Sequence, residues 1–461
     1  MEVRPFSRRL ISVLLCASLA GTVFTGCQKG DDMFPSINPA SEEAEVTESS
    51  GRPSDPAYDT EIRHINVALP YSDLTIQCLA SLLYCKNSGI WDSAESGLTV
   101  DTDYLSSVAT NYVISNSGCR STGVSLDKII DWKSSGTMPD LFLAEDSEAV
   151  WNAGYAGELN SYLSDDLHLS SQQLYAGALT NNSDNGVFFA VPHYCASQIV
   201  IGNTEFIPKS TGKLQTKNST DDLRGYLEAI NEEYPSIAPF AYAYEMIPYL
   251  GSAFNGDIPT SYMVNEEYSK DRENAKNVIS GAADYIKDLY SDSLAADDID
   301  GVDPIIKRNA ALWIDSSAEI GGWMQYFPGN LYLLHLPCDD ASNAGVPYIT
   351  TYSLCVSKDS SDSAFAAEFA SFISFDPDAQ LLIYRLENMT GLMPLIRNDA
   401  IWDLVTEDEF FGHMASDIRQ TMDNAVYCPE SNDSKVYFNT NEYTAGFVKQ
   451  DGDFDPEKCY G

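Results

Sequence analysis

Short apolar runs alternate with amphipathic segments along most of this chain of 461 residues. Residues 62–69 place Ile65, Val67 and Leu69 on one face of a predicted strand, and residues 73–86 follow with helical spacing. An amphipathic segment at 126–133 likewise precedes the apolar run 141–144. This repeated alternation of strand and helix favours an α/β fold. Because the chain is longer than one core usually serves, we expect two lobes.

The same patterns predict the remaining elements. Strands are expected at 187–190 and 198–202, on either side of Pro192, and again at 310–314 and 352–356. Helices are expected after the cap residue Thr220, at 274–290 and at 363–374, with Pro377 opening a further helix. No internal repeat with a fixed period is found.

The first 26 residues have the pattern of an export signal. Arg4, Arg8 and Arg9 precede the apolar run 10–20, which is too short for an ordinary membrane-spanning helix. The run ends in Phe24-Thr25-Gly26-Cys27, similar to a bacterial lipobox, so we expect lipidation at Cys27. An ordinary secretory signal with a chance cysteine remains an alternative. Residues 27–61 are rich in Ser, Pro and acidic side chains, and we expect a disordered linker.

The charge of the chain excludes some partners. Its 68 acidic side chains against 27 Lys and Arg give a formal net charge of −41, which argues against nucleic-acid binding. Beyond Cys16 and Cys27, eight cysteines remain, an even number that is compatible with up to four disulfides in an exported protein. Cys78 and Cys85 are not expected to pair, because seven residues of helix hold them about 10 Å apart.

The sequence lacks the usual motifs for catalysis, metal binding and cofactor binding. The five histidines fall in no HExxH spacing, and the chain contains no GxSxG elbow, phosphate loop or dinucleotide fingerprint. The acidic runs 297–300 and 451–455 do not fit a calcium-binding EF-hand loop and are interpreted as surface loops. We therefore predict no metal, no cofactor and no enzymatic activity.

A set of motifs, in order along residues 62–402, resembles the family-1 extracellular solute-binding proteins of ABC importers, many of which bind sugars. The stretches that carry the resemblance are Leu126–Ile130 with Ser134–Phe142, Phe188–Tyr194 with Ile201–Asn203, Tyr285–Leu289 with Asn309–Ser317, Ala364–Gln380, and Thr390–Pro394. The resemblance implies two α/β lobes that close like a hinge around a solute, a membrane permease as partner, and no catalysis.

By position in the sequence, lobe 1 would take residues 62–190 and 353–390. Lobe 2 would take residues 195–350 and 395–430, followed by an extension at 431–461. We expect a monomer that is anchored by its lipid at the outer face of the bacterial cytoplasmic membrane.

Candidate ligand residues follow from the rule that ligands of open α/β sheets bind beyond the carboxyl ends of the strands. Tyr71, Asp146 and the pair Ser316-Ser317 each follow a predicted strand, and Tyr194 and Tyr352 lie where the chain passes between the lobes. Aromatic rings and carboxylates are the groups that a neutral sugar requires. The alternatives to ligand contact are side-chain packing for the tyrosines, helix capping for the serines and a solvated position in a loop for Asp146.

Some positions depart from the sugar-binding pattern. Leu143 and Ala318 stand where many family members have a stacking aromatic residue, and Trp313 is expected in the core. The sequence thus predicts a binding protein for a small solute, most simply a carbohydrate. An exported glycan hydrolase, or a sensor of the same fold that presents its ligand to a membrane receptor, remain alternatives.

Overall fold

The structure is a computed structural model of the full chain. It describes residues 62–91, 101–163, 174–250 apart from 176, 180, 181 and 185, 272–338, and 347–428. Cys27, the linker and the extension 431–461 lie outside these ranges, and the lobe boundaries given above stay a prediction. Within the described ranges, no helix combines the length and the apolar composition that a membrane crossing requires.

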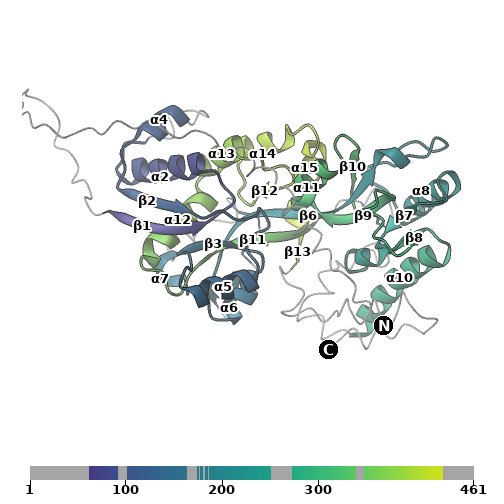
Figure 1. Ribbon diagram of the computed structural model, residues 1–461, viewed down its shortest axis with the longest axis horizontal. Helices are drawn as coiled ribbons and strands as arrows, with labels where there is room; N and C mark the ends of the chain where they lie inside the picture. Colours follow the sequence, from purple (N-terminus) through teal and green to yellow (C-terminus); the bar gives the residue numbers. More distant parts are fainter. Residues whose placement is uncertain are drawn as a thin grey trace, which may run out of the picture. The chain divides into compact units, whose positions relative to one another are not determined.

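Parallel strands form one end of the large sheet (Figure 1). The strands β1 (Arg63–Ala68), β2 (Tyr112–Asn116) and β3 (Leu141–Ala144) are parallel, with β1 between the other two. The long strand β11 (Tyr348–Val356) then pairs antiparallel with β3 and places Ser353 opposite Ala144. Helices separate β1, β2 and β3 in the sequence, which is the alternation of strand and helix that the sequence predicts.

The strand β6 (Val191–Asn203) joins this part of the sheet to a second part. Its first half, from Val191 to Ser197, pairs with β11, and its second half, from Gln198 to Gly202, pairs with β9 (Ala310–Ser316). Beyond β9 lie the parallel strands β7 (Ala238–Ala241) and β8 (Ala295–Ala296), while β10 (Leu331–Leu334) pairs with the end of β6. One strand therefore belongs to both parts, as Figure 1 shows.

Strands occur at both predicted places, β5 (Val187–Phe188) within 187–190 and β6 over 198–202, but β6 is longer than predicted and runs from Val191 through Pro192. Pro192 lies opposite Ser353 and Tyr194 lies opposite Tyr352, so the register shifts and His193 is left over as a bulge. A proline has no N–H to give to a sheet, and bulges are among the few places where an internal strand accepts one. The bulge thus explains how the strand remains continuous.

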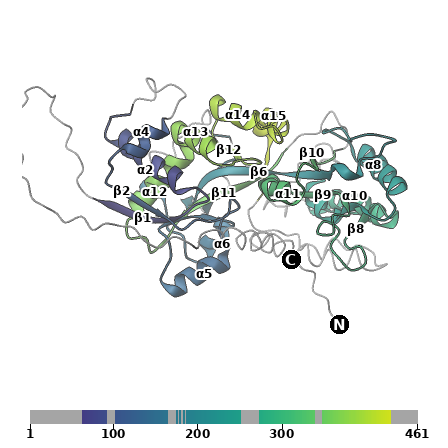
Figure 2. The ribbon, with the colours of Figure 1, turned by 45° about the horizontal axis from the view of Figure 1, so that its top comes forward.

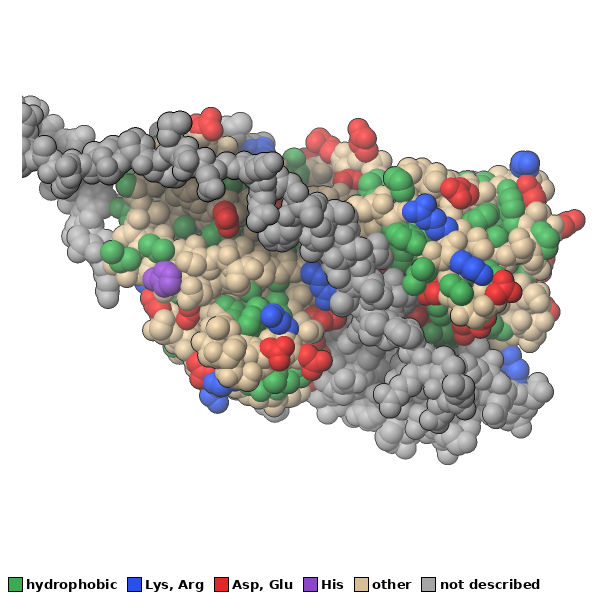
Figure 3. Space-filling model, in the orientation of Figure 1, with side chains coloured by type: hydrophobic (Ala, Val, Ile, Leu, Met, Phe, Trp, Pro, Cys, Tyr) green, Lys and Arg blue, Asp and Glu red, His purple; other side chains and the backbone are tan. Residues whose placement is uncertain are grey.

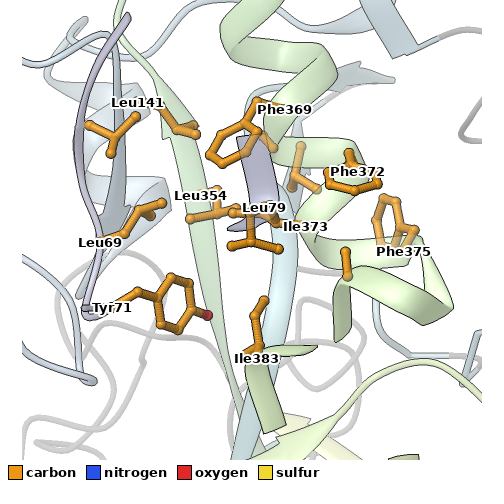
Figure 4. Packing of buried hydrophobic residues seen from close by; sticks show 14 of the residues in the cluster. Leu69, Tyr71, Leu79, Leu141, Leu354, Phe369, Phe372, Ile373, Phe375 and Ile383 are labelled. Atoms are coloured by element: carbon orange, nitrogen blue, oxygen red, sulfur yellow. The ribbon is translucent and has the colours of Figure 1, made fainter. Parts of the chain in front are cut away.

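The first hydrophobic core lies between the sheet and the helices α2 (Asp73–Asn87), α12 (Ser363–Phe375) and α13 (Pro377–Leu386). As predicted, Phe365, Phe369 and Phe372 of α12 are all buried. Figure 4 shows Phe369 of α12 above Leu79 and Leu354, Phe372 and Phe375 further along the same helix, and Tyr71 at the margin of the cluster near Ile383. Pro377 is the first residue of α13, where its missing N–H costs nothing.

The second core is built from β7, β9 and β10 with the helices α8 (Thr220–Glu233) and α10 (Arg272–Ser291). The cap of α8 is Ser219 rather than Thr220. Its hydroxyl accepts a hydrogen bond from Asp222 N, and the Asp222 carboxylate accepts one from Ser219 N. Trp313 of β9 is fully buried, as predicted.

Near its C-terminal end, the described chain adds a short strand to β6 and then forms two helices (Figure 2). β12 (Met393–Pro394) pairs with Cys195 and Tyr194 of β6, and α14 (Asp399–Thr406) and α15 (Gly412–Thr421) come after it. β13 (Val426–Cys428) pairs with the start of β11. Further short helical elements include α5 (Leu126–Ser135), α6 (Ser147–Asn152), η7 (Ser317–Glu319) and α11 (Ile320–Tyr326).

On the face seen in Figure 3, acidic and basic side chains of the described residues are interspersed. Cys78 and Cys85 of α2 are both buried and are not joined, as their helical spacing predicts, and Cys119 and Cys195 are also thiols.

Candidate functional site

The candidate site lies at the carboxyl ends of the parallel strands. In the first part of the sheet, β1 leads to Tyr71, β2 leads to the segment around Arg120, and β3 leads to Glu145 and Asp146. In the second part, β7 leads to Tyr242, and β9 leads into η7. Loops at strand ends are where open α/β sheets bind ligands. Hydrogen bonds of two tyrosines bring loops from both parts of the sheet together.

Tyr71 is buried, with 6% of its surface exposed, and its hydroxyl is hydrogen bonded to His193 Nε2. The other ring nitrogen of His193 lies 3.0 Å from Ser374 Oγ on α12. Burial lowers the pKa of His193 to about 3, so this imidazole is neutral near pH 7. The bulged residue of β6 thus connects the loop after β1 with α12. Tyr71 therefore belongs to the first core, although it also lies after a strand, where a ligand is expected to bind.

Tyr194 and Tyr352 form a ring pair between β6 and β11. Their ring centroids are 5.7 Å apart. The Tyr194 hydroxyl donates a 2.6 Å hydrogen bond to the carbonyl of Ser121, in the segment that follows β2. The Tyr352 hydroxyl lies 3.5 Å from Ser316 Oγ, at the end of β9. The pair therefore contacts loops from both parts of the sheet at once.

Ser317 fixes the position of η7. Its hydroxyl accepts a 3.0 Å hydrogen bond from Ser197 N of β6 and donates one to the carbonyl of Gly391. Gly391 has a φ of +86°, and a Cβ built there would lie 1.9 Å from the Ser317 carbonyl oxygen. The glycine of the Thr390–Pro394 motif is therefore required by this close approach. Ser316 caps η7, because its Oγ accepts a hydrogen bond from Ala318 N, and Ser317 holds the same turn in place. As ligand residues both stay predictions.

Asp146 is half-buried and caps α6. Its carboxylate accepts a 2.9 Å hydrogen bond from Ala149 N. This leaves acceptor capacity on a carboxylate at the strand end, so the cap does not contradict a ligand role. The structure does not otherwise test Asp146, and as a ligand residue it stays a prediction.

A group of charged side chains, which was not predicted, lies around η7. Burial, with the nearby charges of Asp315 and Glu145, raises the pKa of Glu319 to about 7, and Arg120 partly offsets this. Asp315 accepts hydrogen bonds from Trp323 Nε1 at 2.8 Å and from Ser316 N at 2.8 Å. Glu319 follows β9, whereas Arg120 and Glu145 follow β2 and β3. Charged groups from the two parts of the sheet thus act on one another.

Two of the residues that sequence reasoning missed, Arg120 and Tyr242, follow strands that it also missed. The patterns predict no strand at β2, whose sequence YVISN ends in polar residues, or at β7, whose sequence APFA contains a proline. Arg120 follows the first of these strands, and Tyr242 follows the second. Tyr242 has a φ of +55° and donates a 2.8 Å hydrogen bond to Asp303. The strand-end rule itself would have found both residues.

The two positions that depart from the sugar-binding pattern are both buried in the structure. Leu143 is fully buried in the first core, and Ala318 is 8% exposed. Among the residues that the structure describes, no group of three or more His, Cys, Asp or Glu side chains is arranged to hold a metal ion.

Comparisons with known proteins give the class of fold. No family model matches the sequence, and no curated protein matches it. An ABC substrate-binding protein from Listeria monocytogenes, solved in complex with cycloalternan, is similar at a TM-score of 0.59 and 15% identity, over 86% of this chain and 95% of its own. The GacH receptor of Streptomyces glaucescens, solved unliganded and with acarbose, is similar at a TM-score of 0.56 and 16% identity, with the same coverage of 86% and 95%.

A third similar structure is the cyclic α-maltosyl-1,6-maltose binding protein from Arthrobacter globiformis. Its TM-score is 0.56 at 14% identity, over 81% of this chain and 90% of its own. The chain therefore has the two-lobed α/β fold of periplasmic binding proteins. More particularly, it is the fold of the sugar-binding proteins of ABC transporters, which confirms the predicted resemblance at the level of the fold.

Proposed function

We propose that this protein is the solute-binding component of an ABC importer and that its solute is a carbohydrate. The observation that carries the proposal is the Tyr194–Tyr352 pair, which lies on β6 and β11 and contacts strand-end loops from both parts of the sheet. Support for the class of solute comes from the similar structures, whose titles name cycloalternan, acarbose and a cyclic maltosyl-maltose.

The proposed mechanism is reversible binding with closure of the lobes. Ligand contacts from both lobes favour the closed arrangement, which docks on the permease. We propose Asp146, Ser316 and Tyr352 as ligand contacts, with Tyr71, Tyr194 and Ser317 holding the loops in place. The lipid at Cys27 would keep the protein at the outer face of the membrane, and neither the anchor nor the closure needs a cofactor.

A solute screen tests the proposal. Residues 28–461 would be screened by thermal shift against mono- and oligosaccharides, with amino acids and polyamines as the other arms. A carbohydrate at a hundredfold excess over its dissociation constant should stabilise the protein by about 2.7 kcal/mol. Chromatography of each positive sugar should show no consumption. Slow hydrolysis would instead favour the glycan hydrolase, and a stabilising amino acid or polyamine would contradict a carbohydrate solute.

Two variants of Asp146 separate ligand contact from capping. Asp146→Asn retains an N-cap for α6 but removes the charge, so it should keep the unfolding midpoint and weaken the binding of a positive sugar about tenfold or more. Asp146→Ala should lower both, because it also removes the cap. Unchanged affinity in Asp146→Asn would remove this residue from the site.

A further inference from the structure

His193 lies on β6, the strand that belongs to both parts of the sheet, and its side chain is fully buried. It is the bulged residue at the register shift between β6 and β11. A bulged residue is left unpaired in the backbone ladder. The bonds of the imidazole ring therefore hold β6 at a point where the ladder is interrupted.

Both nitrogens of this ring face hydroxyl groups from other elements. The Tyr71 hydroxyl, on the loop after β1, is hydrogen bonded to Nε2, and Ser374 Oγ of α12 lies 3.0 Å from Nδ1. A neutral imidazole has one donor and one acceptor, and a hydroxyl can serve either of them. The neutral ring thus satisfies its hydrogen bonds on both sides without any water.

The titratable groups around the ring carry no negative charge near neutral pH. They are phenols and thiols: Tyr71, Cys119, Tyr194, Cys195, Tyr352 and Tyr384. The ring centroid of Tyr194 lies 4.9 Å from that of His193. Burial raises the pKa of Tyr71 and Tyr194 well above 10, and that of Cys119 to about 12. An imidazolium at this position would therefore meet neutral neighbours.

The carboxylates on the adjoining segments are bonded to other groups. Glu387, at the end of α13, accepts a 2.7 Å hydrogen bond from Ser72 N, and Asp376 binds Lys86 Nζ at 2.7 Å. Burial alone lowers the pKa of His193, to about 3. A proton on this ring would thus place a charge in the core without a counter-ion, which is costly.

We propose that His193 is an acid-sensitive lock on β6, which holds the strand shared by both parts of the sheet at neutral pH and releases it in acid. The released state is the unfolded chain, in which the ring is hydrated and binds a proton freely. The proposal goes beyond the proposed function and holds whatever solute the protein binds.

The direction follows from proton binding in the two states. Below the ordinary pKa of 6.5 the unfolded chain takes up a proton on this ring, whereas the folded chain does so only near pH 3. The stabilisation is therefore complete above pH 6.5 and is lost progressively as the pH falls toward 3. Between pH 8 and 4.5, the unfolding equilibrium constant should rise about 100-fold through this ring alone.

Nuclear magnetic resonance of ring-labelled histidine gives the direct measurement, in the chain with Cys27→Ser. Between pH 8 and 4, one ring should keep the chemical shifts of neutral imidazole. The exposed His64, whose Nε2 lies 3.3 Å from Ser115 Oγ, should titrate. If every ring titrates near pH 6.5, His193 is not locked in the neutral form and the proposal fails, whether or not any variant folds.

Denaturant unfolding at pH 8 and pH 4.5 gives the second measurement. His193→Gln keeps a donor and an acceptor but cannot titrate, so the ratio of the parent's unfolding constant to the variant's should rise about 100-fold in acid. His64→Gln is the matched control, and its ratio should stay within a few-fold. Carboxylates and the other histidines titrate in all three proteins and cancel. A ratio for His193→Gln that does not depend on pH would overturn the proposal.

Discussion

Gly391 shows how much one residue of a short motif can determine. Its positive φ and its closeness to the Ser317 carbonyl leave no room for a side chain. Gly391→Ala should therefore destabilise the protein by about 3 kcal/mol or more, because the strained backbone and the clash add. Denaturant unfolding measures this loss.

A matched glycine provides the control. Gly225 lies inside α8 with no atom within 4 Å of an added Cβ. Gly225→Ala should stabilise the protein by about 0.5–1 kcal/mol, since alanine restricts the unfolded chain and favours helix. Equal effects of the two substitutions would contradict the role assigned to Gly391.

At the scale of the elements, the bulge in β6 should depend on its one histidine. His193→Leu leaves the hydroxyls of Tyr71 and Ser374 without their buried partner, so it should cost about 2–4 kcal/mol of unfolding free energy. Ser374→Ala removes a single hydrogen bond and should cost about 1 kcal/mol. If His193→Leu unfolds at the same denaturant concentration as the parent protein, the network does not stabilise the bulge.

The same strand shows how far sequence reasoning reaches. Helices with clear periodicity, such as α2 and α12, are predicted within one or two residues of their ends. The first half of β6, from Val191 to Ser197, is missed because a local pattern carries no information about the bulge that accepts Pro192. β2 and β7 are missed since their few residues mix polar or proline positions with apolar ones.

The candidate site is predictable to a similar depth. Position after a strand identified Tyr71, Asp146 and Ser316, and all three lie at strand ends in the structure. The caps made by Asp146 and Ser316 are local, but the bond of Tyr71 to His193 and those of Ser317 to Ser197 and Gly391 could not be predicted, because these partners are distant in sequence. Glu319 was missed for the same reason, since its surroundings come from two other loops.

For the molecule as a whole, acid stability should depend on a contact of α15 with the residues that follow β10 and those that precede α8. Asp417 lies 3.2 Å from His335 Nε2 and 3.2 Å from Lys217 Nζ. The hydrogen bond with His335, with further help from Lys217, lowers the pKa of Asp417 to about 2. The stabilisation is therefore complete above the usual pKa of 3.8 and is lost as the pH falls toward 2.

Replacing this carboxylate tests the contact. Asp417→Asn should lower the unfolding free energy at pH 6 by about 1 kcal/mol, after allowance for solvent screening, and should reduce the loss of stability between pH 4 and 2. Asp288→Asn, on the exposed face of α10, should change neither. An unchanged acid profile in Asp417→Asn would show that other carboxylates govern acid unfolding.

The order in which the cores are assembled has a consequence for biosynthesis. The second core draws on residues between Val200 and Tyr348, but the first needs α12 and α13 to cover strands that were synthesised some 300 residues earlier. A nascent chain therefore holds β1 and β3 without α12 and α13 until most of its length has been made. The first core can thus be completed only late in synthesis, whereas the second core needs no residue beyond Tyr348.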